Sequence, residues 1–169
     1  MSWLMLVATI LVLVRRMSFA EDAPAPADEK KAKALKDLLY AAEWACNHLL
    51  EQGYVVTDDL ESLKELDRYF DDNVDEETHQ PVPGTLFAER PIMVVLALGA
   101  LLGEVLRKNY QGEWMLVTDE SMDPAEAIMS STMRMYNRLD CWPMERVGKR
   151  VYQGWENQIY HYACTMRRK

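Results

Sequence analysis

Glycine is scarce in this 169-residue sequence, and the patterns of nucleotide-binding loops and common catalytic centres are missing. None of the seven glycines lies in a Gly-rich phosphate-binding pattern. The Gly-x-Ser-x-Gly pattern of a nucleophilic serine and the His-Glu-x-x-His pattern of a metal-dependent hydrolase are both absent. These absences favour a protein that binds over one that catalyses, so we expect neither an enzyme nor a cofactor.

Cysteine is scarcer still, and the three residues Cys46, Cys141 and Cys164 have the spacing of no zinc motif. Because their number is odd, at least one thiol stays free, although an oxidising compartment could join Cys141 to Cys164. His161 and Cys164 share one helix face, whereas Cys46 and His48 point to different faces. We therefore expect no metal site.

Positively charged residues are fewer than negatively charged ones: the sequence has 19 Lys and Arg against 27 Asp and Glu, which gives a net charge of −8. Such a surface repels phosphate backbones, which argues against a nucleic-acid partner. The deficit is concentrated in residues 58–77, which hold ten carboxylates and two cations. We interpret this segment as a docking face for a protein with a basic surface; an ordinary solvated helix face is the alternative. The candidate partner-binding residues are Asp67, Asp71, Asp72, Asp75, Glu76 and Glu77.

Long hydrophobic runs are few, and the one near the N-terminus covers residues 3–14, twelve uncharged and almost entirely apolar residues. A membrane-spanning helix needs about 20 apolar residues, so this run is short for one. Small residues at Ser18 and Ala20 favour a cleaved export signal, whereas Arg15 and Arg16 directly after the run favour a membrane anchor with a cytoplasmic domain.

A third alternative is that translation starts at Met17, which makes the protein cytoplasmic. We interpret residues 1–20 as a signal or anchor, with an exported, periplasmic protein or one anchored to the inner membrane as the expected outcomes. Residues 21–29 form an acidic Pro/Ala linker, and residues 30–169 form a single globular domain.

Hydrophobic periodicity predicts an α+β fold, a predominantly helical domain with a small antiparallel β-hairpin in its second half. Asp58 followed by Glu61 has the spacing of a capping box, and Pro91 suits the first turn of a central, apolar helix. The expected helices cover residues 28–52, 58–73, 91–109, 143–153 and 156–166, and the expected strands cover residues 113–118 and 127–136.

The segment near residue 130 is ambiguous. Asp123 followed by Pro124 has the chemistry of a helix start, but Met129, Ser131 and Met133 alternate as in a strand. We choose a strand that pairs with residues 113–118.

Several residues are expected to hold the core together. Gly99 and Gly103 lie four apart, which indicates close helix packing. Glu104 lies beside an apolar stripe and needs a basic partner, for which Arg146, Lys149 and Arg150 are the candidates; a catalytic acid at Glu104 is the alternative. Trp114 follows Gly112 and is expected in the core. The structural residues are Gly99, Gly103, Glu104, Trp114, Arg146 and Arg150.

The strings GALLGEVLRKNYQGEW and WPMERVGKRVYQG, residues 99–114 and 142–154, resemble a widespread group of uncharacterised small bacterial domains. The resemblance covers about residues 85–165 and implies a helix, hairpin and helix in that order. Some members lie beside secreted-toxin genes, so the resemblance implies an immunity protein that neutralises a basic toxin. A membrane-tethered accessory subunit of a larger complex is the second interpretation, and an enzyme of unknown class is the third.

Overall fold

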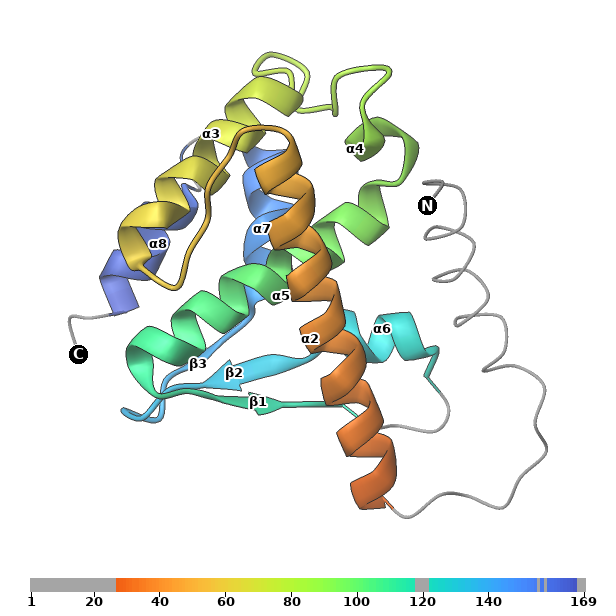
Figure 1. The fold of residues 1–169 in the computed structure, drawn as a ribbon, viewed down its shortest axis with the longest axis vertical. Helices are drawn as coiled ribbons and strands as arrows, with labels where there is room; N and C mark the ends of the chain where they lie inside the picture. Colours follow the sequence, from red (N-terminus) through yellow and green to blue (C-terminus); the bar gives the residue numbers. More distant parts are fainter. Residues whose placement is uncertain (1–26, 118–121, 155, 157, 167–169) are drawn as a thin grey trace.

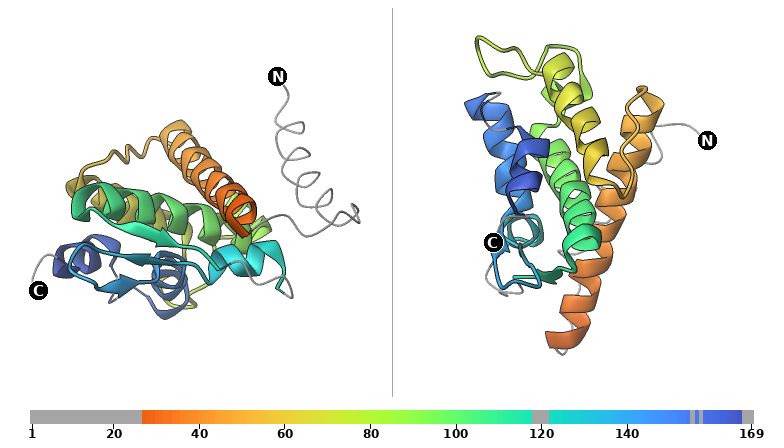
Figure 2. Two further views of the ribbon diagram at one scale, coloured as in Figure 1. Left: turned by 90° about the horizontal axis from the view of Figure 1, so that it is seen from below. Right: turned by 90° about the vertical axis from the view of Figure 1, so that its left-hand side faces the viewer.

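The structure is a computed structural model that describes residues 27–117, 122–154, 156 and 158–166. Its centre is the helix α5 (Pro91–Tyr110), which packs between the long helix α2 (Ala27–Glu51) and the helix α7 (Pro143–Gln153). Viewed from the side, α2 lies on one face of α5, and α7 lies with α8 (Ile159–Thr165) on the other (Figure 2). The fold is α+β and predominantly helical, as predicted.

The helix α5 is central because it is apolar on nearly every side. Pro91 occupies its first turn, where the missing N–H is not needed. The helix ends at Tyr110, and Gln111 adopts the left-handed conformation (φ 50°) before Gly112. Twelve of its twenty residues are buried, which confirms the prediction of a central helix over residues 91–109.

The helix α2 covers one side of α5 with a stripe of small and medium apolar residues. Leu38, Ala45 and Leu49 are completely buried in this contact. The helix begins at Ala27, so the last three residues of the predicted linker are helical. The rest of the linker and the predicted signal or anchor lie outside the described residues.

The second predicted helix starts one residue later than its capping pattern indicates. A 3₁₀-helix η1 (Leu60–Ser62) precedes α3 (Leu63–Asn73), and the N-cap of η1 is Asp59, whose Oδ1 accepts from the Glu61 N–H at 3.2 Å. Asp58 instead forms an ion pair with Lys108 of α5 at 2.5 Å. Asp58, which the local sequence predicts as the N-cap, therefore makes a tertiary contact instead, and Asp59 becomes the N-cap.

The sheet has three antiparallel strands in the order β1 (Glu113–Met115), β2 (Thr132–Arg134) and β3 (Asp140–Cys141). Trp114 pairs with Met133, which confirms that the two predicted segments pair, although both strands are shorter than the expected ranges 113–118 and 127–136. The third strand was not predicted, because two residues give no periodicity.

The start of the predicted second strand is wrong. A short helix α6 (Pro124–Met129) occupies that position, and Asp123 caps it by accepting from the Ala125 N–H at 2.9 Å. The capping chemistry therefore outweighs the alternation of methionines, which holds only from Thr132 onward.

The remaining elements are short, apart from α7, whose bounds agree with the prediction. The helix α4 (Leu86–Glu89) lies in the loop before α5, and α8 is shorter than the predicted helix over residues 156–166. Within the part of the chain that the structure describes, no helix is both long and apolar enough to cross a bilayer.

Candidate functional site

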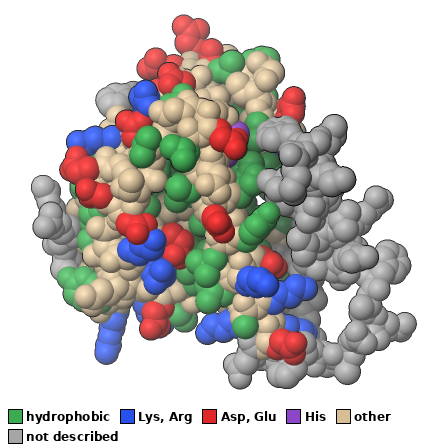
Figure 3. All heavy atoms as spheres, in the orientation of Figure 1, with side chains coloured by type: hydrophobic (Ala, Val, Ile, Leu, Met, Phe, Trp, Pro, Cys, Tyr) green, Lys and Arg blue, Asp and Glu red, His purple; other side chains and the backbone are tan. Residues whose placement is uncertain are grey.

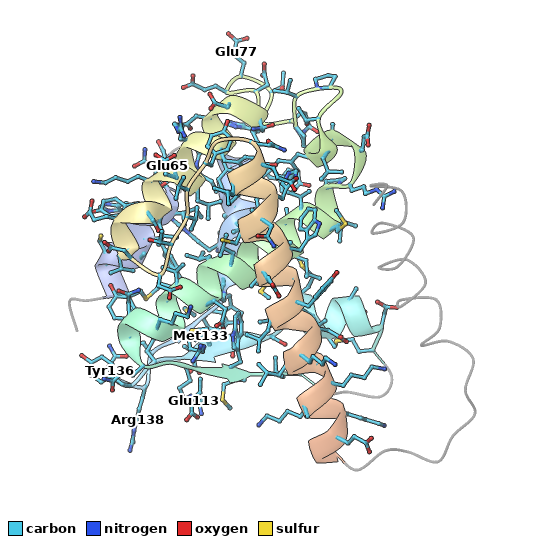
Figure 4. The ribbon with its side chains drawn as sticks, in the orientation of Figure 1. Glu65, Glu77, Glu113, Met133, Tyr136 and Arg138 are labelled. Atoms are coloured by element: carbon cyan, nitrogen blue, oxygen red, sulfur yellow. The ribbon has the colours of Figure 1, made fainter. Side chains whose placement is uncertain are left out.

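Five of the six candidate partner-binding residues lie together at one end of the molecule, at the end of α3 and in the loop that follows. All five are exposed, and Figure 3 shows acidic side chains gathered at this end. Glu77 points away from the body of the protein (Figure 4). We call this group the acidic end; it consists of Asp71, Asp72, Asp75, Glu76 and Glu77.

The sixth residue, Asp67, does not belong to this surface. Its exposed fraction is 7%, and its carboxylate accepts from the N–H groups of Ile159 at 2.7 Å and Tyr160 at 2.9 Å. Asp67 thus satisfies the first amides of α8 from a neighbouring helix. Burial raises the pKa of Asp67, against the opposing effect of these hydrogen bonds and of Arg150. The prediction that Asp67 binds a partner is wrong, because the side chain is used inside the fold.

Arg150 of α7 joins Asp67 to the acidic end. Its side chain is only 4% exposed, its Nε lies 3.5 Å from Asp67 Oδ1, and its Nη2 donates to Asp71 Oδ1. The Asp71 side chain stays 60% exposed. Asp71 therefore has a structural role, because its Oδ1 pairs with the buried Arg150, although most of its side chain remains exposed to water.

The loop after α3 is held in a defined shape by Asp75. Its Oδ1 accepts from the Thr78 N–H at 2.7 Å, the Thr78 hydroxyl at 2.8 Å and the Glu77 N–H at 3.1 Å. These hydrogen bonds lower the pKa of Asp75. A bridge between Val74 and Pro81 closes the loop at its base. Asp75 is thus a turn residue.

Glu76 and Glu77 are the most available carboxylates of the acidic end. Both are exposed, and neither forms an ion pair with any described residue. Asp72, by contrast, accepts from the Tyr54 hydroxyl at 2.7 Å. The last turn of α3 contains no basic residue, so Asp71 and Asp72 lie at the negative end of the helix dipole, and the cation that compensates Asp71 comes from Arg150 of α7.

A cavity of about 300 Å³ opens beside the acidic end. One of its lining residues is His79, which the sequence assigns to no active site because no Ser or Cys nucleophile lies near it in the loop. Its backbone is left-handed (φ 54°), and its ring lies against Gly154, where a Cβ would approach its Cε1 to 2.6 Å. The other lining residues include Phe70, Asp71, Asp75, Glu76, Arg150 and Gln158.

Glu104 has a different partner from the predicted ones. Its carboxylate accepts from Arg107, with Nε to Oε1 at 3.0 Å and Nη2 to Oε2 at 2.9 Å, and from the indole Nε1 of Trp114 at 2.9 Å. Arg146, Lys149 and Arg150 are therefore not its partners. Arg107 could have been predicted, because residues three apart on one helix are neighbours and often form ion pairs. Glu104 thus connects β1 to α5, and both of its carboxylate oxygens accept hydrogen bonds.

The close packing predicted for Gly99 and Gly103 is confirmed. A Cβ on Gly99 would lie 2.7 Å from the Cα of Met144 in α7, and a Cβ on Gly103 would collide with the indole ring of Trp114. Trp114 is 6% exposed, which confirms it as a core residue.

Arg146 belongs to the packing of α8. Its guanidinium lies 4.6 Å from the centre of the Tyr162 ring, and its Nη2 donates to the Gln158 carbonyl at 3.3 Å. Burial lowers the pKa of Arg146. All three cysteines are free, and burial raises the pKa of Cys141 to about 11, so this thiol is unreactive at neutral pH. The described residues contain no cluster that could hold a metal ion.

Comparison with protein-family models, with curated proteins and with solved structures gives no match. The likeness to small bacterial domains stays a prediction.

Proposed function

We propose that this chain is a non-enzymatic binding protein whose acidic end docks on a basic surface of another protein. The observation that carries the proposal is the pair Glu76 and Glu77, two exposed carboxylates without a cation partner among the described residues. Asp75 holds the turn that presents them, and the bridge at Val74 holds the turn in place.

The arrangement favours binding for an energetic reason. Carboxylates at the end of α3 and in the next turn repel one another and the helix dipole, which costs a few tenths of a kcal/mol for each exposed charge. A cationic partner removes this repulsion and is drawn to the acidic end over a Debye length of about 8–10 Å in physiological salt. A secreted toxin with a basic cleft is such a partner, which makes an immunity protein the specific form of the proposal.

The test uses a variant that removes charge without touching the fold. Glu76→Gln with Glu77→Gln removes two negative charges that have no structural role. Glu113→Gln with Glu126→Gln is the matched control, since both carboxylates are exposed on other elements. Partners captured from the native host by the full chain and by the control, and lost with the acidic-end variant, are then purified.

Association rates with the purified partner decide between steering and an ordinary wet surface. We expect the Glu76/Glu77 variant to associate several-fold more slowly at low salt, with a difference that shrinks as salt is raised. Stopped-flow mixing at two salt concentrations measures this. Equal association rates for the variant and the control would contradict the proposal and mean that the acidic end is an ordinary solvated surface.

A second candidate function rests on the outer side of α2. Leu35, Leu39 and Leu50 expose 36%, 40% and 58% of their surface along this helix. Such a row favours packing against a larger assembly, the accessory-subunit interpretation. Leu39→Gln with Leu50→Gln would release the protein from such an assembly and leave the toxin-binding activity intact.

A further inference from the structure

Three helices enclose an apolar groove on a part of the surface that the acidic end does not use. The groove has a volume of about 360 Å³ and lies where the start of α5, the end of α6 and one side of α7 meet. Its main lining residues are Ile92, Val95, Met129, Met144, Gly148 and Tyr152.

Nothing in the described residues fills this groove. Ile92 is 70% exposed and Tyr152 is 51% exposed, although both are large and apolar. Gly148 lies in the middle of α7, and apart from its chain neighbours and the adjacent helix backbone no described atom lies within 4 Å of the position that its Cβ would take. Single exposed apolar residues are common, but a hollow lined by several of them marks a docking surface.

The chain carries one segment whose chemistry matches the groove. Residues 3–14 are uncharged and almost entirely apolar. They are too few to span a bilayer, which takes about 20 residues, but as a helix they would be about 18 Å long. In water such a segment would expose apolar surface on every side, so it gains free energy by burial in any apolar groove that it can reach.

The connection is long enough to bring the segment to the groove. Residues 15–26 lead to the start of α2, and twelve extended residues span about 40 Å. Part of α2 contacts α6, and both views place α6 beside the first half of α2 (Figures 1 and 2). Met129, the last residue of α6, lines the groove. The tether therefore leads to the helix that contacts α6, and α6 borders the groove.

We propose that residues 3–14 dock into this groove of their own chain when no membrane is present. The charges agree with an apolar occupant, because residues 3–14 are uncharged and the two charged side chains at the groove, Glu145 and Lys149, pair with each other at 2.6 Å. A bilayer and the groove compete for the same segment. When residues 3–14 occupy the groove, they are not available to insert into a membrane.

The test is a site-specific photo-crosslink in the full chain, with its N-terminus confirmed by intact mass. Benzoylphenylalanine replaces Tyr152 in the groove, and in the control it replaces Tyr136, which is 67% exposed and does not line the groove. After irradiation and digestion, we expect position 152 to be joined to the peptide of residues 1–15. Position 136 should give no such product.

A mixture of isotopically heavy and light chains separates the possible occupants. A segment that docks on its own chain gives crosslinks only within heavy or within light chains. Mixed products would show that a second copy fills the groove and would overturn the proposal. Crosslinks from position 152 to any other region, or none at all, would also overturn it.

Filling the groove provides a second, independent measurement. Gly148→Leu places a side chain in the open space of the groove, and we expect the crosslink yield to fall about ten-fold, the effect of losing the burial of one leucine-sized group. Gly148→Ala is the control and should keep most of the yield. Neither variant should melt at a lower temperature, since α7 is helical at Gly148 and glycine disfavours a helix. A yield unchanged by Gly148→Leu contradicts docking in this groove.

Discussion

Trp114 is the side chain on which the junction between sheet and helix depends. Its ring lies against Gly103 of α5, and its Nε1 donates to Glu104, whose other contacts go to Arg107. The residue thus combines a large buried apolar surface with a hydrogen bond to a charged group. A substitution can remove either contribution separately.

Trp114→Ala should lower the free energy of unfolding by about 3–5 kcal/mol, the range for removing a large aromatic side chain from a core. Trp114→Phe keeps most of the apolar contact and loses the hydrogen bond to Glu104, so it should cost about 1–3 kcal/mol. Urea denaturation of both variants measures the difference. A loss below about 1 kcal/mol for Trp114→Ala would mean that the ring is not part of the core.

His48 should make the stability depend on pH. The residue is 7% exposed, stacks on Trp44 with ring centres 5.0 Å apart, and its Nε2 lies 3.0 Å from the Gln52 amide nitrogen. Burial lowers its pKa in the folded state below the ordinary value of 6.5. The unfolded chain therefore binds a proton more readily, so the free energy of unfolding should fall as the pH decreases below about 6.5.

Denaturation of wild type and His48→Gln at pH 7.5 and pH 5.5 measures this effect. The glutamine keeps a polar group near Gln52 but does not titrate. We expect wild type to lose more stability than the variant on acidification. If both lose the same amount, the pH dependence comes from other groups.

At the scale of elements, the helix α8 depends on a residue far away in the sequence. It has only seven residues, and Asp67 of α3 accepts from its first two amides. Isolated helices of this length are unstable in water, so α8 must be held by tertiary contacts.

Asp67→Ala should lower the free energy of unfolding by at least about 2 kcal/mol, because α8 loses its cap and the buried Arg150 loses a carboxylate. Asp67→Asn keeps one acceptor and should cost less. Hydrogen exchange should show faster exchange at Ile159 and Tyr160 in the alanine variant. Unchanged exchange there would mean that α8 is held by packing alone.

The elements also show how far sequence reasoning extends. The helix α5 was predicted because Pro91 marks its start and its residues are apolar on every side, and α7 because Pro143 marks its start and Gly154 its end. The roles of Asp58 and Asp67 could not be predicted, since each depends on a contact with a helix 50 or more residues further along the chain. The sequence gives the position of each carboxylate along the chain, but whether water or protein surrounds it depends on the fold.

The acidic end shows the same division. Local charge density correctly placed Glu76 and Glu77 on an exposed loop. Charge density alone could not distinguish these two freely exposed carboxylates from Asp75, which stabilises the turn, or from Asp71, which pairs with Arg150. The contact of His79 with Gly154 could not be predicted, because these residues lie 75 positions apart and only the fold brings them together.

At the scale of the whole molecule, the apolar N-terminal run and the folded domain are predicted to be separable. Deletion of residues 2–16 should move the protein to the soluble fraction of its native host and shift its melting temperature by only a few degrees, because all described core residues come later in the chain. Fractionation followed by thermal melting measures both properties. Full-length protein that is already wholly soluble, cytoplasmic and begins at Met17 would contradict both the anchor and the export interpretations.

The bond between Asp67 and the start of α8 joins residues 92 positions apart, and the bond between Asp71 and Arg150 joins residues 79 apart. During synthesis the acidic end therefore leaves the ribosome long before the helices that support it. Its final shape must wait until α7 and α8 have been translated and have packed against α3. A chain that is still being made therefore does not display the finished acidic end until α7 and α8 have left the ribosome.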